Sequence, residues 1–253
     1  MNFKMNMITS TLLAAGFSLL AGSAAAQTCV ANNCAALGFT KSASNCEGDI
    51  IRCPFDTSKV FCKEKKVYAP KPGDILYSDG TISDSVIASK TPVGIVAYVN
   101  GSNGFAVSLT EVSKTWSSGY EDVSCLTNYS SSSTAMTDMN GKTNTMCLVN
   151  YSGSYSYPAA EYCNTFSAVS NGKGSSGWYL PAAGELYSMS FSYGAINLGL
   201  QKLSKTQISS NYYWSSSEYA NYGGAWNVRP SDGYMGGSLT KSNSRPVRCV
   251  LAL

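Results

Sequence analysis

The sequence contains no histidine and few charged residues, and these two absences argue against several functions. Without histidine, the chain lacks the commonest general base and the commonest zinc ligand of proteins. The formal net charge is only +3, whereas nucleic-acid binding requires clustered lysine and arginine that neutralise phosphates. No Cys-x-x-Cys pair occurs, which argues against zinc and thioredoxin-like redox sites. We therefore expect no nucleic-acid partner, no metal and no cofactor.

The sequence also has little that could span a membrane. Its apolar run from Ile8 to Leu20 is shorter than the ~20 residues that a membrane-spanning helix needs. Lys4 is the only charged residue before this run, and small residues follow the run as far as Ala26. A basic start, a short apolar core and an Ala-x-Ala site are the three parts of a secretory signal. We predict cleavage before Gln27 and no transmembrane segment in the mature chain.

Cysteine, by contrast, is abundant, because nine cysteines follow the predicted cleavage site. In an exported protein these residues are expected to form structural disulfides. Five lie close together and four are spread over the rest of the chain: Cys29, Cys34, Cys46, Cys53 and Cys62, then Cys125, Cys147, Cys163 and Cys249. The odd residue is most simply Cys29, which stays free, pairs with another module or links two chains into an oligomer. The connectivity of Cys34, Cys46, Cys53 and Cys62 stays open.

The composition changes near residue 66, which predicts a division of the mature chain. Residues 1–26 form the signal peptide, residues 27–66 a cysteine-rich module and residues 67–253 the main domain. The module has little apolar content, and a segment so small must be held by disulfides. A basic, proline-containing stretch at residues 63–72 is typical of a stiff linker.

The main domain shows patterns of both strands and helices. Strands are expected at 73–78, 93–99, 105–112, 212–215, 225–228 and 247–251. Helices are expected to begin at Pro158, Pro181 and Ile196, and the first is expected to end at Asn171 and Gly172. Residues 116–157 show neither period and are interpreted as an excursion containing two cysteines. Strands, then helices, then strands predict an α+β fold with both ends of the domain in one sheet.

Several motifs of the main domain occur in the order found in a known family. The motifs are AAEYC at 159–163, GWYLPAAGEL at 177–186, YWSSSE at 213–218, AW at 225–226 and RPVRCV at 245–250. With them, the region from Val67 to the end resembles the Lcl C-terminal domain, which is named from a collagen-like adhesin and was long catalogued as a domain of unknown function. The resemblance implies a C-type-lectin-like fold in a secreted or surface protein of a bacterium. It is less specific for function, because this fold hosts sugar, protein and phage-receptor binding alike.

The resemblance has further implications for disulfides and ligands. Lectin-like domains commonly tie their first helix to their last strand, where Cys163 and Cys249 fall here, which leaves Cys125 with Cys147. Sugar-binding C-type lectins often hold calcium through Glu-Pro-Asn or Gln-Pro-Asp and Trp-Asn-Asp, and none of these occurs. Formylglycine-generating enzymes share the fold, but their Gly-Asn-Val-Trp-Glu-Trp signature is also absent.

Two sets of residues in these motifs have a structural interpretation. The first set sits in apolar patterns and is expected in the core: Trp178, Leu180, Trp214 and Trp226. The second is the pair Glu185 and Glu218, which we expect to cap or brace the backbone rather than to form a catalytic pair of carboxylates.

Residues 211–244 are the predicted binding region, because Tyr, Ser, Gly and Asn dominate there. Antibody paratopes have this composition, since tyrosine offers stiff contact area while the small polar residues adapt their hydrogen bonds. The candidate ligand-binding residues are Tyr212, Tyr219, Tyr222, Trp226, Arg229, Asp232 and Tyr234. We expect Trp226 to support this face partly from below. Aromatic faces also stack on sugar rings, so the expected partner is an extracellular glycan or protein.

Together these observations predict a secreted or surface-exposed bacterial binding or adhesion protein that is not an enzyme. The alternative is a structural component of a surface appendage or envelope assembly. An enzyme related to formylglycine-generating proteins is the third and weakest interpretation. The expected location is extracellular or at the cell surface, with the periplasm as an alternative.

Overall fold

The computed structural model describes Cys34, Phe39 and residues 49–54, 56–63, 68–101, 103–221 and 223–253. The chain divides between Val67 and Tyr68 into two compact units, called unit 1 and unit 2 below. The predicted signal peptide, Cys29, Cys46 and Tyr222 lie outside the described residues. No described helix is long and apolar enough to cross a membrane.

The described part of unit 1 is built around one hairpin and its disulfides. Strands β1 (Asp49–Arg52) and β2 (Val60–Lys63) pair antiparallel, with Ile51 opposite Phe61. A disulfide joins Cys34 to Cys53, whose Cα atoms are 6.1 Å apart, and Cys62 is disulfide-bonded too. All four side chains of β1 are exposed. Disulfides therefore take the place of the apolar interior that so small a segment cannot build.

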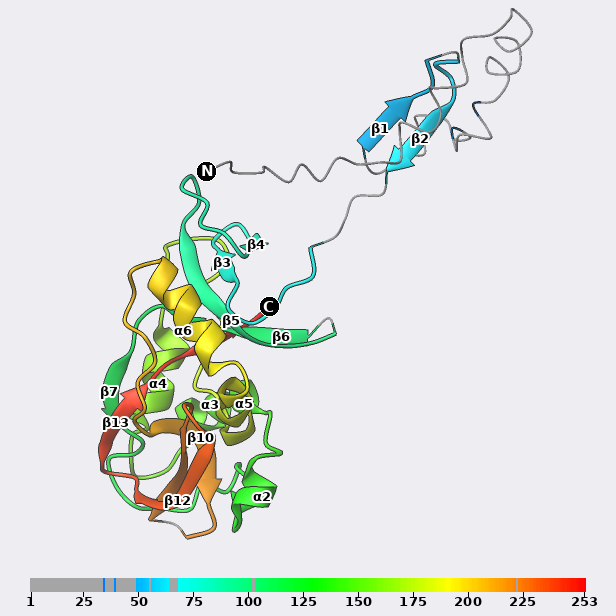
Figure 1. The fold of residues 1–253 in the computed structure, drawn as a ribbon. Coiled ribbons are helices and arrows are strands. Elements are labelled where there is room, and N and C mark those ends of the chain that lie inside the picture. Colours follow the sequence, from blue (N-terminus) through cyan, green and yellow to red (C-terminus); the bar gives the residue numbers. More distant parts are fainter. Residues whose placement is uncertain are drawn as a thin grey trace, which may run out of the picture. The chain divides into compact units, whose positions relative to one another are not determined.

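Unit 2 is a mixed α+β structure, as predicted (Figure 1). Its strands are β3 (Ile75–Tyr77), β4 (Ile82–Ser83), β5 (Pro92–Asn100), β6 (Asn103–Ser108), β7 (Val112–Thr115), β8 (Asn128–Tyr129), β9 (Trp178–Tyr179), β10 (Tyr213–Tyr219), β11 (Gly224–Arg229), β12 (Tyr234–Thr240), β13 (Ser244–Val247) and β14 (Val250–Ala252). Its helices are α2 (Ser132–Ala135), α3 (Gly141–Asn150), α4 (Pro158–Thr165), α5 (Ala183–Ser190) and α6 (Tyr193–Lys202).

The larger sheet of unit 2 has the order β4-β3-β5-β6-β14-β9. The β5–β6 hairpin forms its centre, with Ile95 opposite Val107. The last strand, β14, pairs antiparallel with β6, so that Val250 also lies opposite Val107. In Figure 1 the red end of the chain reaches β5 and β6. The prediction that both ends of the domain share one sheet is therefore confirmed.

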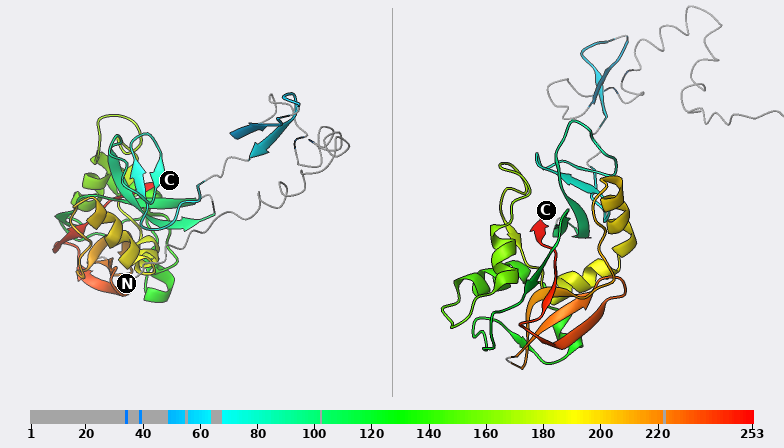
Figure 2. Two further views of the ribbon diagram at one scale, coloured as in Figure 1. Left: turned by 45° about the horizontal axis from the view of Figure 1, so that its top comes forward. Right: turned by 90° about the vertical axis from the view of Figure 1, so that its left-hand side faces the viewer.

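A second, four-stranded sheet has the order β12-β11-β10-β8. Strand β11 pairs antiparallel with both neighbours, so Val228 lies opposite Tyr213 and Arg229 lies opposite Tyr234. Figures 1 and 2 show β10, β11 and β12 of this sheet, in orange and red, at the other end of unit 2 from the cyan strands of the larger sheet. Strand β12 was not among the expected strands. Its sequence, YMGGSLT, contains two glycines and little alternation, so it has no strand period of its own.

Two hydrophobic clusters fill unit 2, and the four residues predicted for the core are buried in them. Trp178 is 2%, Leu180 0%, Trp214 0% and Trp226 3% exposed. Trp226 belongs to the cluster that joins β5, α5 and α6 to the small sheet. The other three belong to the cluster around the first helices and the last strands. The core thus extends along both sheets.

Two helical predictions need correction. Residues 141–150, expected in a nonhelical excursion, form α3, whose buried face consists of only Gly141, Thr145 and Leu148. A single large apolar residue gives no helical period. Helix α4 ends at Thr165, before the expected Asn171 and Gly172, because Phe166 adopts extended backbone. There its ring packs edge-on against Trp178, at 5.1 Å between centroids.

Two disulfides cross-link unit 2. One joins Cys163 in α4 to Cys249, which precedes β14, and their Cα atoms are 5.3 Å apart. The other joins Cys125 to Cys147 in α3, with Cα atoms 6.0 Å apart. Both pairs are those that the family resemblance implies. Cys163 and Cys249 are buried, so this bond lies within the apolar interior.

Glu218 is fully buried and braces the segment that precedes β8. Its carboxylate accepts a hydrogen bond from the backbone N–H of Val123, at 3.1 Å to Oε2. It also pairs with Lys241, which is equally buried. The Lys241 ammonium donates to the carbonyl of Glu121 at 2.6 Å and lies over the Trp116 ring. Burial raises the pKa of Glu218, and the hydrogen bond from Lys241 opposes that rise.

Glu185 braces the start of α5. Its carboxylate accepts hydrogen bonds from the backbone N–H of Ala182 at 2.8 Å and from the hydroxyl of Tyr179 at 3.0 Å. Burial raises the pKa of this carboxyl to about 7, while these hydrogen bonds act in the opposite direction. Both predicted carboxylates therefore contact backbone N–H groups, as expected.

Candidate binding surface

The turn between β11 and β12 gathers three of the predicted binding residues around one guanidinium group. Arg229 ends β11 and Tyr234 begins β12, so antiparallel pairing places them opposite each other. The Arg229 guanidinium lies 5.2 Å from the ring centre of Tyr212 and 5.4 Å from that of Tyr234. The two rings meet edge to face at 6.0 Å. The guanidinium thus lies beside both tyrosine rings, which also contact each other.

Asp232 fixes this arginine from within the same turn. The Nε and Nη2 atoms of Arg229 donate to the carboxylate of Asp232 at 2.9 and 2.6 Å. The carboxylate also accepts the backbone N–H of Tyr234 at 3.1 Å. Hydrogen bonding from Arg229 lowers the pKa of Asp232, so the carboxylate stays ionised. The paired charges neutralise each other and hold the turn in one shape.

Tyr219 and Trp226 lie elsewhere on the small sheet. Tyr219 ends β10, six residues after Tyr213 and hence roughly 20 Å farther along the strand. Its half-buried ring packs edge-on against Trp226, with centroids 5.3 Å apart. The Trp226 indole is buried and donates its N–H to the carbonyl of Tyr129 at 3.1 Å.

The structure therefore brings together Tyr212, Arg229, Asp232 and Tyr234, and it separates them from Tyr219 and Trp226. The expected single contact face does not form from these residues, because Tyr212 precedes the first residue of β10 and Tyr219 is its last residue, so the strand separates them. Tyr222 lies outside the described residues.

Two aromatic residues that the sequence did not single out lie beside this turn. Tyr187 and Phe191, at the end of α5, meet edge to face at 5.3 Å. Gly233 approaches Tyr187 so closely that a Cβ atom there would lie 3.0 Å from the ring. Phe191 is 76% exposed and Tyr234 is 59% exposed. The sequence held one indication of this exposure. Phe191 is a large apolar residue that does not continue the helical spacing of the buried Leu186 and Met189.

We call this contiguous surface the aromatic face: Tyr187, Phe191, Tyr212, Arg229, Asp232 and Tyr234. Its exposed rings offer stiff contact area, and its one ion pair is satisfied internally. Such a face suits stacking on another flat or apolar surface. Among the described residues, no group of three or more His, Cys, Asp or Glu side chains is placed to hold a metal ion.

Comparison with known proteins finds similarity in fold. The chain is similar to a fimbrial protein from Bacteroides ovatus. Its crystal structure superposes with a TM-score of 0.56 and 21% sequence identity, over 72% of this chain and 48% of that protein. The chain thus spans about half the length of its structural relative. At this identity the likeness shows the fold alone.

No family model and no curated protein matches the chain. The resemblance to the Lcl C-terminal domain, and the C-type-lectin-like fold that it implies, therefore stay predictions. The coarser prediction of a mixed α+β, disulfide-containing domain is confirmed.

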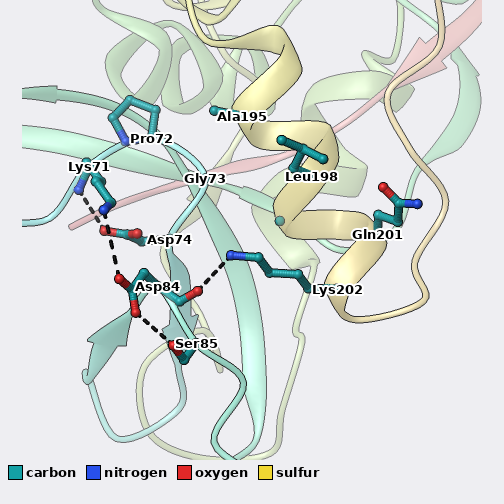
Figure 3. A pocket seen from close by; sticks show the side chains of 11 residues that line it. Lys71, Pro72, Gly73, Asp74, Asp84, Ser85, Ala195, Leu198, Gln201 and Lys202 are labelled. Carbon is teal, nitrogen blue, oxygen red and sulfur yellow. Dashed lines mark hydrogen bonds and ion pairs between the residues drawn. The ribbon is translucent and has the colours of Figure 1, made fainter. Parts of the chain in front are cut away.

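Unit 2 also has an open groove of about 530 Å³ beside α6 (Figure 3). Leu198 and Ala195 of α6 line one side, and the segment from Lys71 to Asp74 lines the other. The ammonium group of Lys202 donates to the carbonyl of Asp84 at 2.7 Å. The Asp84 carboxylate lies 3.9 Å from the ammonium of Lys71. These polar groups partner one another across the groove, so the aromatic face is the stronger candidate.

Proposed function

We propose that the chain is an exported structural component of a bacterial surface appendage or envelope assembly. The observation that carries this proposal is the fold likeness to a fimbrial protein. The alternative function predicted from the sequence thereby becomes the leading one. A role in binding a glycan or protein becomes the second candidate, and catalysis is no part of the proposal.

The disulfides of both units support an extracellular location. Cytosolic thiols are kept reduced, whereas exported and surface proteins retain their disulfides. In this chain the bonds occur in the hairpin module and in unit 2, where the Cys163–Cys249 bond is buried and the Cys125–Cys147 bond lies nearer the surface. An appendage component must keep its shape outside the cell without chaperones. We accordingly propose cleavage of the signal peptide after Ala26, followed by oxidation of the cysteines.

The proposal is tested by mechanical shearing of cells of the native host. Sheared material is separated by size and probed with an antibody to unit 2. The chain should appear in high-mass sheared material while a periplasmic and a cytoplasmic marker stay with the cells. Recovery of the chain only with the periplasmic marker, or only as a free monomer, would refute the proposal.

The second candidate is favoured by the stacked Tyr212, Arg229 and Tyr234 cluster, which resembles a paratope in composition. It predicts binding of the mature chain on a glycan and host-protein array. Replacing Tyr212 and Tyr234 by alanine should remove that signal, and replacing Tyr155, an exposed tyrosine that packs beside Gly119, should not. Loss in both variants, or in neither, would exclude the cluster as the site.

A further inference from the structure

Strands β7 and β13 form a two-stranded sheet that places two cations opposite each other. Antiparallel pairing puts Arg245 directly opposite Lys114, beside α4 (Figure 1). Side chains in this position lie on one face of a sheet with Cβ atoms roughly 5 Å apart, and like charges there repel each other. Both residues are half-buried, so water screens the repulsion only in part. The fold therefore carries a repulsion that an anion beside the two groups would relieve.

The guanidinium group of Arg245 has no partner among the described residues. Its Nε atom is buried and makes no hydrogen bond, and its two Nη atoms, which bond to no described residue either, remain open to solvent. The other two arginines of unit 2 differ, because Arg229 and Arg248 each pair with a carboxylate, at 2.6 and 3.1 Å. Since water does not hydrate the buried nitrogen, an acceptor at the Nη atoms gains more than it would on a fully hydrated arginine.

Lys114 is held by an aromatic ring rather than by a carboxylate. Its ammonium group lies over Tyr162 of α4, 5.7 Å from the ring centre. Such a contact positions the side chain without cancelling its charge. The neighbouring carboxylates in sequence have other partners, since Glu111 pairs with another arginine and Glu161 accepts the backbone N–H of Tyr157 at 2.9 Å. No ion pair joins either cation to a carboxylate in the described part of the chain.

We propose that Arg245 and Lys114 form a binding site for a carboxylate group. A carboxylate is planar, and its two oxygens match the paired N–H donors at the end of a guanidinium group. Lys114 adds a second positive charge beside them. The ligand is therefore a molecule that carries an exposed carboxylate, on a sugar acid or on an amino acid. Binding here requires no assembly of copies, so the site is independent of the proposed structural role.

The test is a nuclear magnetic resonance titration of the refolded, oxidised mature chain labelled with nitrogen-15. Sodium acetate, which supplies the carboxylate group alone, replaces sodium chloride at constant ionic strength. The Nε–H signal of Arg245 and the backbone signals of β7 and β13 should shift and saturate. The dissociation constant should be on the order of 1–10 mM, as two charge-assisted hydrogen bonds allow.

Three variants separate a specific site from general attraction to positive charge. Arg245→Lys keeps the charge but loses the paired donors, so it should bind acetate at least roughly tenfold more weakly. Lys114→Gln removes the second charge and should weaken binding as well. Lys205→Gln removes an exposed charge after α6, and as the matched control it should bind like the wild type. The same spectra show whether each variant keeps the wild-type fold.

Two further probes distinguish the sources of the carboxylate, since glucuronate carries it on a sugar and N-acetylaspartate on an amino acid. The probe that binds more tightly than acetate identifies the source. Three results would overturn the inference. They are signals that do not saturate with any carboxylate, folded Arg245→Lys or Lys114→Gln chains that bind acetate as tightly as the wild type, and inorganic phosphate that binds more tightly than every carboxylate.

Discussion

At the scale of single residues, the stability of unit 2 depends on two buried carboxyl groups that have different neighbours. Glu218 pairs with the ammonium of Lys241, whereas Glu185 accepts hydrogen bonds from Tyr179 and nearby backbone and lies near the like charge of Asp138. Burial raises the pKa of both groups, but only Glu218 has a cation beside it. We therefore expect the two sites to respond differently to mutation and pH.

Removing Lys241 should be strongly destabilising. The change Lys241→Met leaves the Glu218 carboxylate buried without its partner, which typically costs about 3–5 kcal/mol. Glu218→Gln should also destabilise, and the double variant should lose less than the sum of the single losses. Urea denaturation of the three variants measures this coupling. Lys90→Met, which breaks an exposed pair with Asp79, is the control and should cost under about 1 kcal/mol. Additive losses would show that the buried pair is not coupled.

Glu185 should make unit 2 less stable as the pH rises from about 4.5 to 7. In that window the folded carboxyl, with its pKa raised to about 7, keeps a proton that the unfolded one has lost. The free energy of unfolding then falls as pH rises, by about 3 kcal/mol in total. Glu185→Gln should match the wild type near pH 4.5 and exceed its stability near pH 8. Equal free energies of unfolding for Glu185→Gln and the wild type at pH 8, measured by urea titration, would contradict this account.

At the scale of elements, the sequence is informative where apolar spacing and proline define a segment. Helix α5 follows Pro181 and buries Leu186 and Met189 at helical spacing, and the β5–β6 hairpin joins two β-branched runs. Helix α3 and strand β12 could not be predicted, because tertiary contacts outweigh their weak local patterns. Thr145 in α3, for instance, hydrogen-bonds to both the carbonyl and the N–H of Leu180.

The candidate surface shows the same limit of prediction from sequence. Tyrosine-rich composition pointed to residues 211–244, and Tyr212, Arg229, Asp232 and Tyr234 of that region cluster at the β11–β12 turn. Composition could not show that Tyr219 packs on Trp226 or that α5 adds Tyr187 and Phe191. Those contacts depend on how the small sheet pairs and on the close approach of Gly233.

The two disulfides of unit 2 should differ in their contribution to stability. Cys163 and Cys249 are 86 residues apart, and Cys125 and Cys147 are 22 residues apart. On the chain-entropy model the first bond contributes about 4–5 kcal/mol and the second about 3 kcal/mol. Replacing both cysteines of each pair by alanine, followed by urea denaturation, measures the two losses. A larger loss for the Cys125 pair would contradict the expected order.

At the scale of the whole molecule, the chain combines a disulfide-held hairpin with an α+β domain similar in fold to a fimbrial protein. The proposed structural role rests on that likeness in fold.

Immunogold electron microscopy of cells of the native host tests this central claim most directly. The antibody should recognise unit 2, and a strain that lacks the gene serves as the control. We predict gold particles on filaments or other structures that project from the cell surface, and none on the control strain. Label confined to the cytoplasm or spread through the periplasm, with surface structures unlabelled, would contradict the account.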